Sequence, residues 1–458
     1  MTKQVSMKKF ILLFLVSGLT LGLQAQLAGI YTIDGTAPSK KTNFNSINDA
    51  IDALRFQELE GDVTFMLKDA EYFQPLVLES VYNELGYNVH FTASADEKVH
   101  LTNDGLSLLV SNSSNLSFSN IKFQAISTEM SSMVMLSNSS NITIEQNEFN
   151  SSEDDASFKN IMEISSSSHD NLIEENTFKG TGGITIERLS NNNVIVNNKL
   201  YFQANGIEVL SALNTSIEGN TLQAMNKETS QGILIDGFVG ELNIASNAIL
   251  NVNQGIAQEV TYRPSTEKVT GNIVNNVIES DGNSISLNNN VDKLKIAFNT
   301  INSRTGSVLV VNEEIKGSMD NISLFANNLI NEDEIVIMNI SSDKFLTNTD
   351  YNNIYNEDGF FSTKVGSTES SSIDEWKANM NADHAISADP LFIANGGKQY
   401  LLSDRSPCID AGPDAFEIGV LADFDGDKRG EVTEIGADEF NKFAFDEILN
   451  QIQLAQSR

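Results

Sequence analysis

The feature that most restricts the fold of this chain is a short motif that returns about ten times between residues 118 and 355. In each copy an aliphatic or aromatic residue lies shortly before an Asn and another lies shortly after it, as in Ile144-Glu145-Gln146-Asn147-Glu148-Phe149. The repeated residues are Asn120, Asn147, Asn176, Asn198, Asn220, Asn247, Asn276, Asn299, Asn328 and, more loosely, Asn353. Neighbours in this series are 22 to 29 residues apart, a period typical of solenoid proteins, so each copy is expected to mark one coil.

Asn suits a sharp corner between two short strands, because it tolerates the left-handed backbone conformation and its amide can bond the backbone or a second amide. If the coils stack about 4.8 Å apart, as neighbouring strands do, these amides form a ladder and the flanking apolar residues fill the interior. The period-two alternation of β-branched residues argues against helices, and the dense Leu pattern of a leucine-rich repeat is missing. The sequence therefore predicts an all-β parallel β-helix of about ten or more coils.

The segments on either side of the repeats differ from them in character. The predicted regions are a signal peptide (1–25), an N-terminal cap with the first coils (27–100), the β-helix repeats (101–356), and C-terminal coils with a cap (357–458). Residues 44–59 have helical spacing with Asn45 or Ser46 as N-cap, and a helix here would cover the open edge of the first coil. A short capped helix is expected near residues 370–376 and another over 443–454.

The first 25 residues indicate export. Lys8 and Lys9 precede the apolar run Phe10 to Val16, and Ala25 offers a small residue at a plausible cleavage point. The run is shorter than the roughly 20 residues that a membrane span requires, and no later stretch is apolar enough to span. The mature chain is therefore expected in the periplasm, at the cell surface or outside the cell. Its single cysteine, Cys408, allows no internal disulfide and is expected to be a small buried residue.

The chain is strongly acidic, with 62 Asp and Glu against 29 Lys and Arg and a net charge of −33. Phosphate binding depends on clustered Lys and Arg, so nucleic acid is excluded as a partner. The same charge disfavours polyanionic ligands.

Several short sequence segments resemble those of a known superfamily. They are Tyr31-Thr32-Ile33, Asp389-Pro390-Leu391-Phe392, Ser406-Pro407-Cys408-Ile409-Asp410-Ala411-Gly412, Asp423-Phe424-Asp425-Gly426-Asp427-Lys428-Arg429 and Ile435-Gly436-Ala437-Asp438-Glu439. This combination resembles secreted right-handed parallel β-helix proteins of the pectate-lyase-like superfamily, especially those of Bacteroidota. The resemblance implies the right-handed form of the fold, export and an association with polysaccharides, and it implies no particular activity.

Four coils begin with Gly and carry an acid on a strand. If the residues after each Gly alternate, the side chains expected to point inward are Ile184, Ile186, Ile207, Val209, Ile233, Ile235 and Ile256. The acids Glu187, Glu208, Asp236 and Glu259 then share an outer face. Carboxylates on adjacent coils could lie about 5 to 10 Å apart, as in glycoside hydrolysis, where one acid needs a raised pKa. An acidic, solvated strand face is the alternative interpretation of the same residues.

A lyase needs a base and a positive group that neutralises a substrate carboxylate. The candidates are Arg188, Arg263, Arg304 and His169. None of them is expected to repeat on a face with these four acids at coil spacing, and no catalytic motif of a β-helix lyase matches them.

Alternating carboxylates around a Gly turn suit a hard cation, so Asp423, Asp425 and Asp427 are candidate calcium ligands. Lys428 stands where an EF-hand loop has its Gly, which makes a turn-forming acidic loop the competing interpretation. Apart from calcium, no cofactor is indicated. Two functions stay open: a module that binds polysaccharide or glycan along the solenoid, and a polysaccharide-degrading hydrolase or lyase that uses the outward carboxylates.

Overall fold

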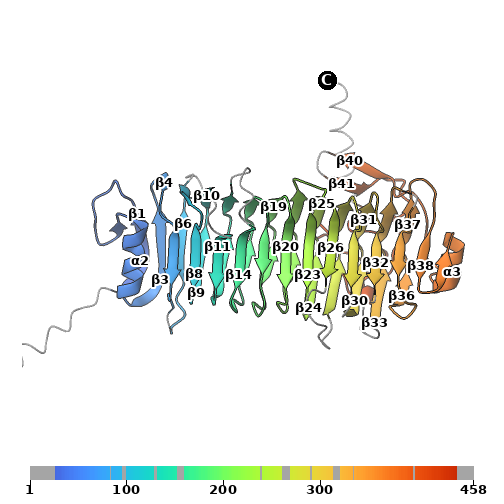
Figure 1. Cartoon of the computed structure of the whole chain (residues 1–458), viewed down its shortest axis with the longest axis horizontal. Coiled ribbons are helices and arrows are strands. Elements are labelled where there is room, and N and C mark those ends of the chain that lie inside the picture. Colours follow the sequence, from blue (N-terminus) through green and yellow to red (C-terminus); the bar gives the residue numbers. More distant parts are fainter. Residues whose placement is uncertain are drawn as a thin grey trace, which may run out of the picture.

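The chain folds as one elongated stack of coils, each of which contributes strands to three long sheets (Figure 1). The computed structural model describes residues 26–82, 84–94, 99–127, 132–151, 159–237, 240–259, 269–288, 291–312, 320–333, 335–395 and 398–440. The predicted right-handed parallel β-helix is confirmed. The predicted signal peptide (1–25) and the helix over 443–454 lie outside the described residues. Within the described ranges, no helix has both the length and the apolar character needed to cross a membrane.

Sheet A runs along one side of the stack. Its 14 strands are, in spatial order, β2 (Asn43–Phe44), β1 (Leu27–Ile33), β3 (Leu59–Leu67), β6 (Val89–Ala93), β9 (Ser114–Ser119), β12 (Ser140–Glu145), β15 (Leu172–Glu174), β18 (Val194–Val196), β21 (Ser216–Glu218), β24 (Glu241–Ala245), β27 (Val269–Val274), β30 (Val291–Ala297), β33 (Asp320–Phe325) and β36 (Leu346–Asp350).

Sheet B follows sheet A in every coil. Its 12 strands are β4 (Glu71–Tyr72), β7 (Val99–Asp104), β10 (Ile121–Ser127), β13 (Glu148–Asn150), β16 (Thr177–Lys179), β19 (Lys199–Phe202), β22 (Thr221–Ala224), β25 (Ala248–Val252), β28 (Val277–Ser280), β31 (Thr300–Ser303), β34 (Asn328–Asn331) and β37 (Asn353–Asn356).

Sheet C completes the coil. Its 13 strands are β5 (Leu76–Glu79), β8 (Leu108–Ser111), β11 (Ser132–Ser137), β14 (Asn160–Ser165), β17 (Ile184–Ile186), β20 (Asn205–Leu210), β23 (Gln231–Asp236), β26 (Gln254–Glu259), β29 (Ile285–Asn288), β32 (Leu309–Asn312), β35 (Met338–Ile340), β38 (Thr363–Val365) and β39 (Thr368–Ser370). All pairs in the three sheets are parallel except β38 with β39.

The predicted Asn ladder runs through the corner between sheets A and B. Its members are Asn147, Asn176, Asn198, Asn220, Asn247, Asn276, Asn299, Asn327 and Asn352, and each is at most 1% exposed. Within the ladder, the Asn198 amide donates to Ile173 O at 2.8 Å and to Asn220 Oδ1 at 3.0 Å. Asn220 Oδ1 also accepts the backbone N–H of Asn198 at 2.9 Å. Asn198 therefore ties its coil to the coils on both sides.

Two details of the predicted ladder are wrong. The left-handed residue of each corner precedes the ladder Asn, as in Gln146 (φ 55°), so the repeated Asn is selected for its amide and not for its backbone. In the coils with Asn327-Asn328 and Asn352-Asn353, the first Asn of the pair enters the ladder, which places Asn327 and Asn352 there instead of Asn328 and Asn353. Asn120 is itself a left-handed residue (φ 57°), and the apolar Ile121 occupies the ladder position of its coil.

The interior is filled by aliphatic side chains and by stacked aromatic rings. The predicted inward residues of the four Gly-led coils, Ile184, Ile186, Ile207, Val209, Ile233, Ile235 and Ile256, are at most 2% exposed, so their orientation is confirmed. On sheet B, the ring centroids of Phe123 and Phe149 are 4.8 Å apart, and those of Phe149 and Phe178 are 5.0 Å apart.

Glycine is required where sheet B turns into sheet C. A Cβ on Gly206 would lie 2.6 Å from the carbonyl oxygen of Gly232 and 2.7 Å from Leu222 Cδ2. Gly183, Gly232 and Gly255 occupy the same position in their coils and would meet similar obstacles. The absence of side chains at this corner lets successive coils approach closely.

Helices lie at both ends of the stack in Figure 1. Helix α2 (Ile47–Phe56) begins at the N-cap Ser46, whose hydroxyl accepts from Asp49 N at 3.1 Å, and it buries Ile47, Ala50 and Ile51. Helix α3 (Ile373–Met380) begins at Ser372 and buries Trp376 in the same core. Both expected helices are confirmed, whereas the capping role of the end regions stays a prediction.

The last described part of the chain, residues 386–395 and 398–440, turns back along the solenoid, and we call it the folded-back segment. It contains β40 (Phe392–Asn395), β41 (Lys398–Leu402) and the short helix α4 (Ala415–Ile418). Figure 1 shows β40 and β41 beside the last coils. Hydrogen bonds hold the segment there: Cys408 Sγ lies 3.2 Å from Asn328 Oδ1, and Gly436 N donates to Ala326 O at 2.9 Å.

The corner that receives the folded-back segment has an apolar composition. The left-handed corner residues of the earlier coils are Asn120, Gln146, Glu175, Asn197, Gly219, Ser246 and Asn275, and the last of these hydrogen-bonds with the segment through Ala422 and Arg429. The covered coils have Phe298, Ala326 and Tyr351 at this position, and Val420 packs into the cluster that contains Phe298 and Ala326. This switch from polar to apolar corner residues marks the docking surface.

Candidate functional site

The four acids predicted to share a face follow two different columns on sheet C. Register pairs Leu210 with Asp236 and Asp236 with Glu259, and Glu187 follows the pair Ile186–Val209 at the same level. Glu208 lies two residues earlier, opposite Thr185. The structure therefore groups Glu187, Asp236 and Glu259 at the strand ends and places Glu208 in the middle of its strand.

Glu208 is the most enclosed of these acids, at 6% exposure. Thr185 Oγ1 donates to Glu208 Oε2 at 2.9 Å, and Asn205 Nδ2 donates to Oε1. Register places Glu163, a residue that the sequence analysis missed, opposite Thr185 on the other side. Burial, followed by the charges of Glu163 and Glu208, raises the pKa of Glu187. The three glutamates form a carboxylate group that contains one carboxyl with a raised pKa.

Asp236 and Glu259 lie outside this carboxylate group. Gln231 Nε2 donates to Gln254 Oε1 at 2.8 Å and approaches Glu259 Oε1 at 3.4 Å, so Glu259 belongs to an amide cluster. Neither acid contributes to the raised pKa of Glu187.

The acidic loop predicted to bind calcium is organised by its own backbone. Asp423 is 2% exposed, and its Oδ1 accepts the N–H groups of Asp425 at 3.1 Å and Asp427 at 2.7 Å. Its Oδ2 accepts the N–H of Glu439 at 2.9 Å. Across the residues that the structure describes, no group of three or more His, Cys, Asp or Glu side chains is arranged to hold a metal ion. These hydrogen bonds explain the loop without an ion, and the calcium site stays a prediction.

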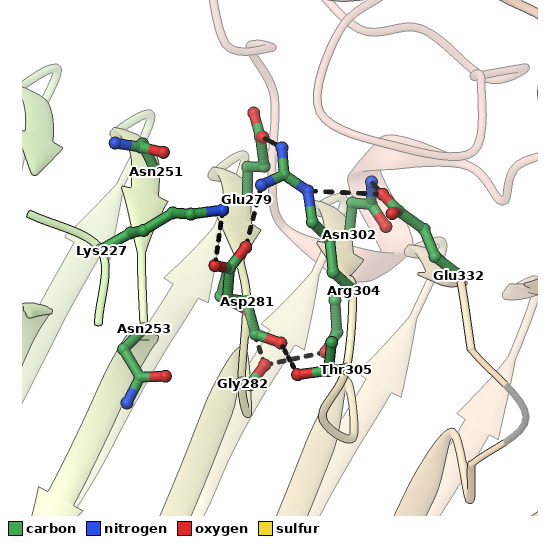
Figure 2. A network of polar contacts seen from close by, with 12 residues as sticks. Lys227, Asn251, Asn253, Glu279, Asp281, Gly282, Asn302, Arg304, Thr305 and Glu332 are labelled. Carbon is green, nitrogen blue, oxygen red and sulfur yellow. Dashed lines mark hydrogen bonds and ion pairs between the residues drawn. The ribbon is translucent and has the colours of Figure 1, made fainter. Parts of the chain in front are cut away.

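A second polar cluster lies where three neighbouring strands of sheet B end (Figure 2). Arg304 donates to Asp281 Oδ1 at 2.9 Å and to Glu279, and its Nε lies 3.8 Å from Glu332 Oε1. Lys227 Nζ lies 2.9 Å from Asp281 Oδ2. We call these five residues the Arg304 network.

The network follows from the stacking of coils. Asp281, Arg304 and Glu332 each come directly after the last residue of their strands β28, β31 and β34, and Ser280 pairs with Ser303 and Ser303 with Asn331. The sequence analysis considered Arg304 only against the four candidate acids, which lie on sheet C, and it missed the acids of sheet B that flank Arg304. Loop lengths vary between coils, and only alignment of the strands themselves brings these three residues into register. Arg263, another of the cations considered, lies outside the described residues.

The network is charged and partly open to solvent. Burial alone would raise the pKa of Asp281, but hydrogen bonds from Lys227 and Arg304 hold that pKa below its ordinary value. Side-chain exposure is 34% for Arg304 and 33% for Glu332. Asn302 adds an amide that donates to Glu332 Oε1 at 2.8 Å, and Figure 2 shows Asn251 and Asn253 flanking the network. Guanidinium, carboxylate and amide groups thus face outward together.

Comparison with known proteins gives likeness in structure only. No family model and no curated protein sequence matches the chain. A solved complex of XylC with xylose aligns with a TM-score of 0.59 at 9% identity, over 90% of this chain and 99% of that one. The pectate lyase Pel9A aligns with a TM-score of 0.43 at 13% identity, over 91% and 97% of the two chains. A rhamnogalacturonan lyase aligns with a TM-score of 0.41 at 10% identity, over 92% and 98%. On the likeness to XylC and on its own sheet topology, the chain has the right-handed parallel β-helix fold that its resemblance to the pectate-lyase-like superfamily implies.

Proposed function

We propose that this chain is an exported β-helix protein that binds a polysaccharide or surface glycan on the outer side of sheet B, at the Arg304 network. The observation that carries the proposal is the convergence of a guanidinium, three carboxylates and several amides from successive coils on one partly open surface. XylC, which shares the fold, was solved with xylose. The leader-like residues 1–25 support export.

The chemistry of the network suits sugar hydroxyls. A hydroxyl is both a donor and an acceptor, so carboxylates can accept from it while Arg and Asn side chains donate to it. Binding sites fix their ligands with a few precisely placed polar groups of these kinds. Because Arg304 and Glu332 keep about a third of their surface exposed, a ligand can reach them without unfolding the coil.

Charge restricts the class of glycan. The network contains three carboxylates and two cations, and the whole chain has a net charge of −33. A polyanionic glycan would be repelled at long range by this field. We therefore expect binding to neutral polysaccharides such as xylan or galactomannan and weaker binding to polygalacturonate or alginate.

Affinity electrophoresis against that panel tests the proposal. Arg304→Gln should weaken binding about tenfold, because it removes charge-assisted hydrogen bonds worth about 1.5–3 kcal/mol. Arg304→Lys keeps the charge and loses the planar guanidinium group, so it should bind more tightly than Arg304→Gln and more weakly than wild type. Arg55→Gln, at the far end of the stack, is the matched control and should bind like wild type. No retardation of the wild-type chain by any neutral polysaccharide contradicts the proposal.

A second candidate function is hydrolysis of a polysaccharide at the carboxylate group of sheet C. The favouring observation is the pairing of Glu187, whose pKa is raised by burial and by its neighbours, with the enclosed Glu208. A glycosidase uses one carboxyl with a raised pKa as the acid and a neighbouring carboxylate as the base or nucleophile.

If this second function holds, the wild-type chain releases reducing ends from a polysaccharide of the panel. Glu208→Gln should then lower the rate by at least about a hundredfold, the usual contribution of a general acid or base. Asp236→Asn, outside the carboxylate group, should leave the rate unchanged. Equal rates in wild type and Glu208→Gln would show that these acids take no part in the mechanism. Binding without release of reducing ends would contradict the hydrolase function and support glycan binding only.

A further inference from the structure

A tyrosine from the folded-back segment joins the Arg304 network from outside the coils. Tyr400 belongs to β41, yet its phenol lies close enough to Glu279 and Asn302 on sheet B for both side chains to influence its pKa. Residues 121 and 98 positions apart in the sequence therefore meet at this point.

The position of Tyr400 is fixed by packing. Its ring meets Phe392 edge-on, with centroids 5.3 Å apart and an interplanar angle of 86°. Phe392 packs against the cluster of Leu402, Cys408 and Ile435. The Cys408 thiol hydrogen-bonds with the side-chain amides of Asn328 and Asn353. The solenoid itself thus holds the β40–β41 hairpin beside the network.

Asn302 has one polar atom without a partner at this junction. Its Nδ2 donates to Glu332 Oε1 at 2.8 Å and also serves the Tyr400 hydroxyl. Its Oδ1 is buried and has no hydrogen-bond partner among the described residues. A buried acceptor left unpaired is costly, so this carbonyl is suited to receive a hydrogen bond from a ligand.

The surroundings of Tyr400 also favour its neutral form. Burial, and then the charge of Glu279, raise its pKa well above the ordinary value of a phenol. The hydroxyl therefore stays protonated at physiological pH and keeps the Glu279 carboxylate oriented.

We propose that the glycan site is composite, with the β40–β41 hairpin as its second wall, and that Tyr400 and Asn302 select a free hydroxyl of a neutral sugar. The inference rests on the proposed glycan binding. A ligand hydroxyl donates to Asn302 Oδ1 and accepts from Arg304, while Tyr400 positions Glu279 and Asn302 from the hairpin side. Tyr400 is thus a positioning residue, and Asn302 is a residue that determines specificity.

The test compares two forms of one ligand, namely the neutral polysaccharide that wild type binds most tightly and its O-methylated derivative. Tyr400→Phe keeps the ring on Phe392 and removes only the hydroxyl, whereas Asn302→Leu keeps the side-chain shape and removes the amide. Each variant should weaken binding of the native polysaccharide about fivefold, the value of one hydrogen bond. Neither variant should change the residual binding of the methylated form, which cannot donate to Asn302. Tyr82→Phe, with a side chain 69% exposed in the first coils, is the matched control.

The outcomes separate the inference from the function on which it rests. Failure of wild type to bind any neutral polysaccharide overturns the proposed function itself. Tight binding by wild type that is unchanged in Tyr400→Phe and Asn302→Leu overturns the composite site and leaves the function standing. An equal loss of binding for the native and methylated polysaccharides also overturns the inference, because a loss of local packing would produce it.

Discussion

Asn220→Ala is expected to lower the free energy of unfolding by at least about 3 kcal/mol, because it opens the amide ladder in the middle of the stack. Asn220 donates to Ile195 O at 2.8 Å, Glu218 O at 3.0 Å and Asn247 Oδ1 at 3.0 Å. Its Oδ1 is also the acceptor for the buried backbone N–H of Asn198. Each buried group left without a partner costs about 1–3 kcal/mol.

Urea denaturation measures this effect, and the chain offers a matched control. Asn339 lies on the outer side of β35 and is exposed, so Asn339→Ala should change the free energy of unfolding by less than about 0.5 kcal/mol. Asn220 does not have a left-handed backbone, so alanine introduces no strain of its own there. Equal effects of the two substitutions would show that the ladder contributes no special stability.

Arg429→Ala is expected to release the folded-back segment from the coils. Arg429 is fully buried, donates to Asn275 Oδ1 at 3.0 Å and to Gly436 O at 3.0 Å, and lies 4.1 Å from the centroid of the Phe298 ring. It also pairs with Glu439. Removing one partner of a buried ion pair costs about 3–5 kcal/mol, which is enough to open a segment of this size.

The single cysteine reports on this opening. Cys408 is buried between the segment and the coils, so its reaction with a neutral thiol reagent measures how often the segment detaches. Arg429→Ala should increase the reaction rate at neutral pH at least about a hundredfold, by the conversion of about 3 kcal/mol. A rate equal to that of wild type would contradict the assigned role of Arg429.

Glu434→Gln is the matched control for this experiment. Burial, and then the hydrogen bond and charge of Glu439, raise the pKa of Glu434 to about 9, so the acid is protonated at neutral pH and glutamine resembles it. When folding raises the pKa of a carboxyl, the free energy of unfolding falls as the pH rises from the ordinary pKa of that carboxyl to its raised pKa. Protection of Cys408 should therefore fall in wild type as the pH approaches 9, and it should fall less in Glu434→Gln.

The coil architecture could be predicted from sequence because its causes are local and repeated. The Asn amide and the inward apolar residues recur in most coils, and the Gly corner recurs in four of them, so their periods show the fold. The position of Asn327 in the ladder could not be predicted, because the adjacent Asn328 fits the same motif and only the backbone conformation of the corner distinguishes them.

The docking of the folded-back segment and the Arg304 network were missed for different reasons. Docking depends on contacts between residues more than 100 positions apart, such as Asn275 with Arg429, and its sequence signal is the change to Phe298 and Ala326 at the corners. The network depends on coil register, which variable loops conceal. Aligning strand ends in place of motif residues would have placed Arg304 between Asp281 and Glu332.

The most direct test of the proposed function is a crystal structure of the chain soaked with an oligosaccharide from the neutral polysaccharide that it binds. We expect a sugar hydroxyl within hydrogen-bond distance of Arg304, with the ligand lying between sheet B and the β40–β41 hairpin. Sugar bound instead on sheet C beside Glu187 and Glu208, or on any other face, would contradict the assignment of the Arg304 network as the glycan site.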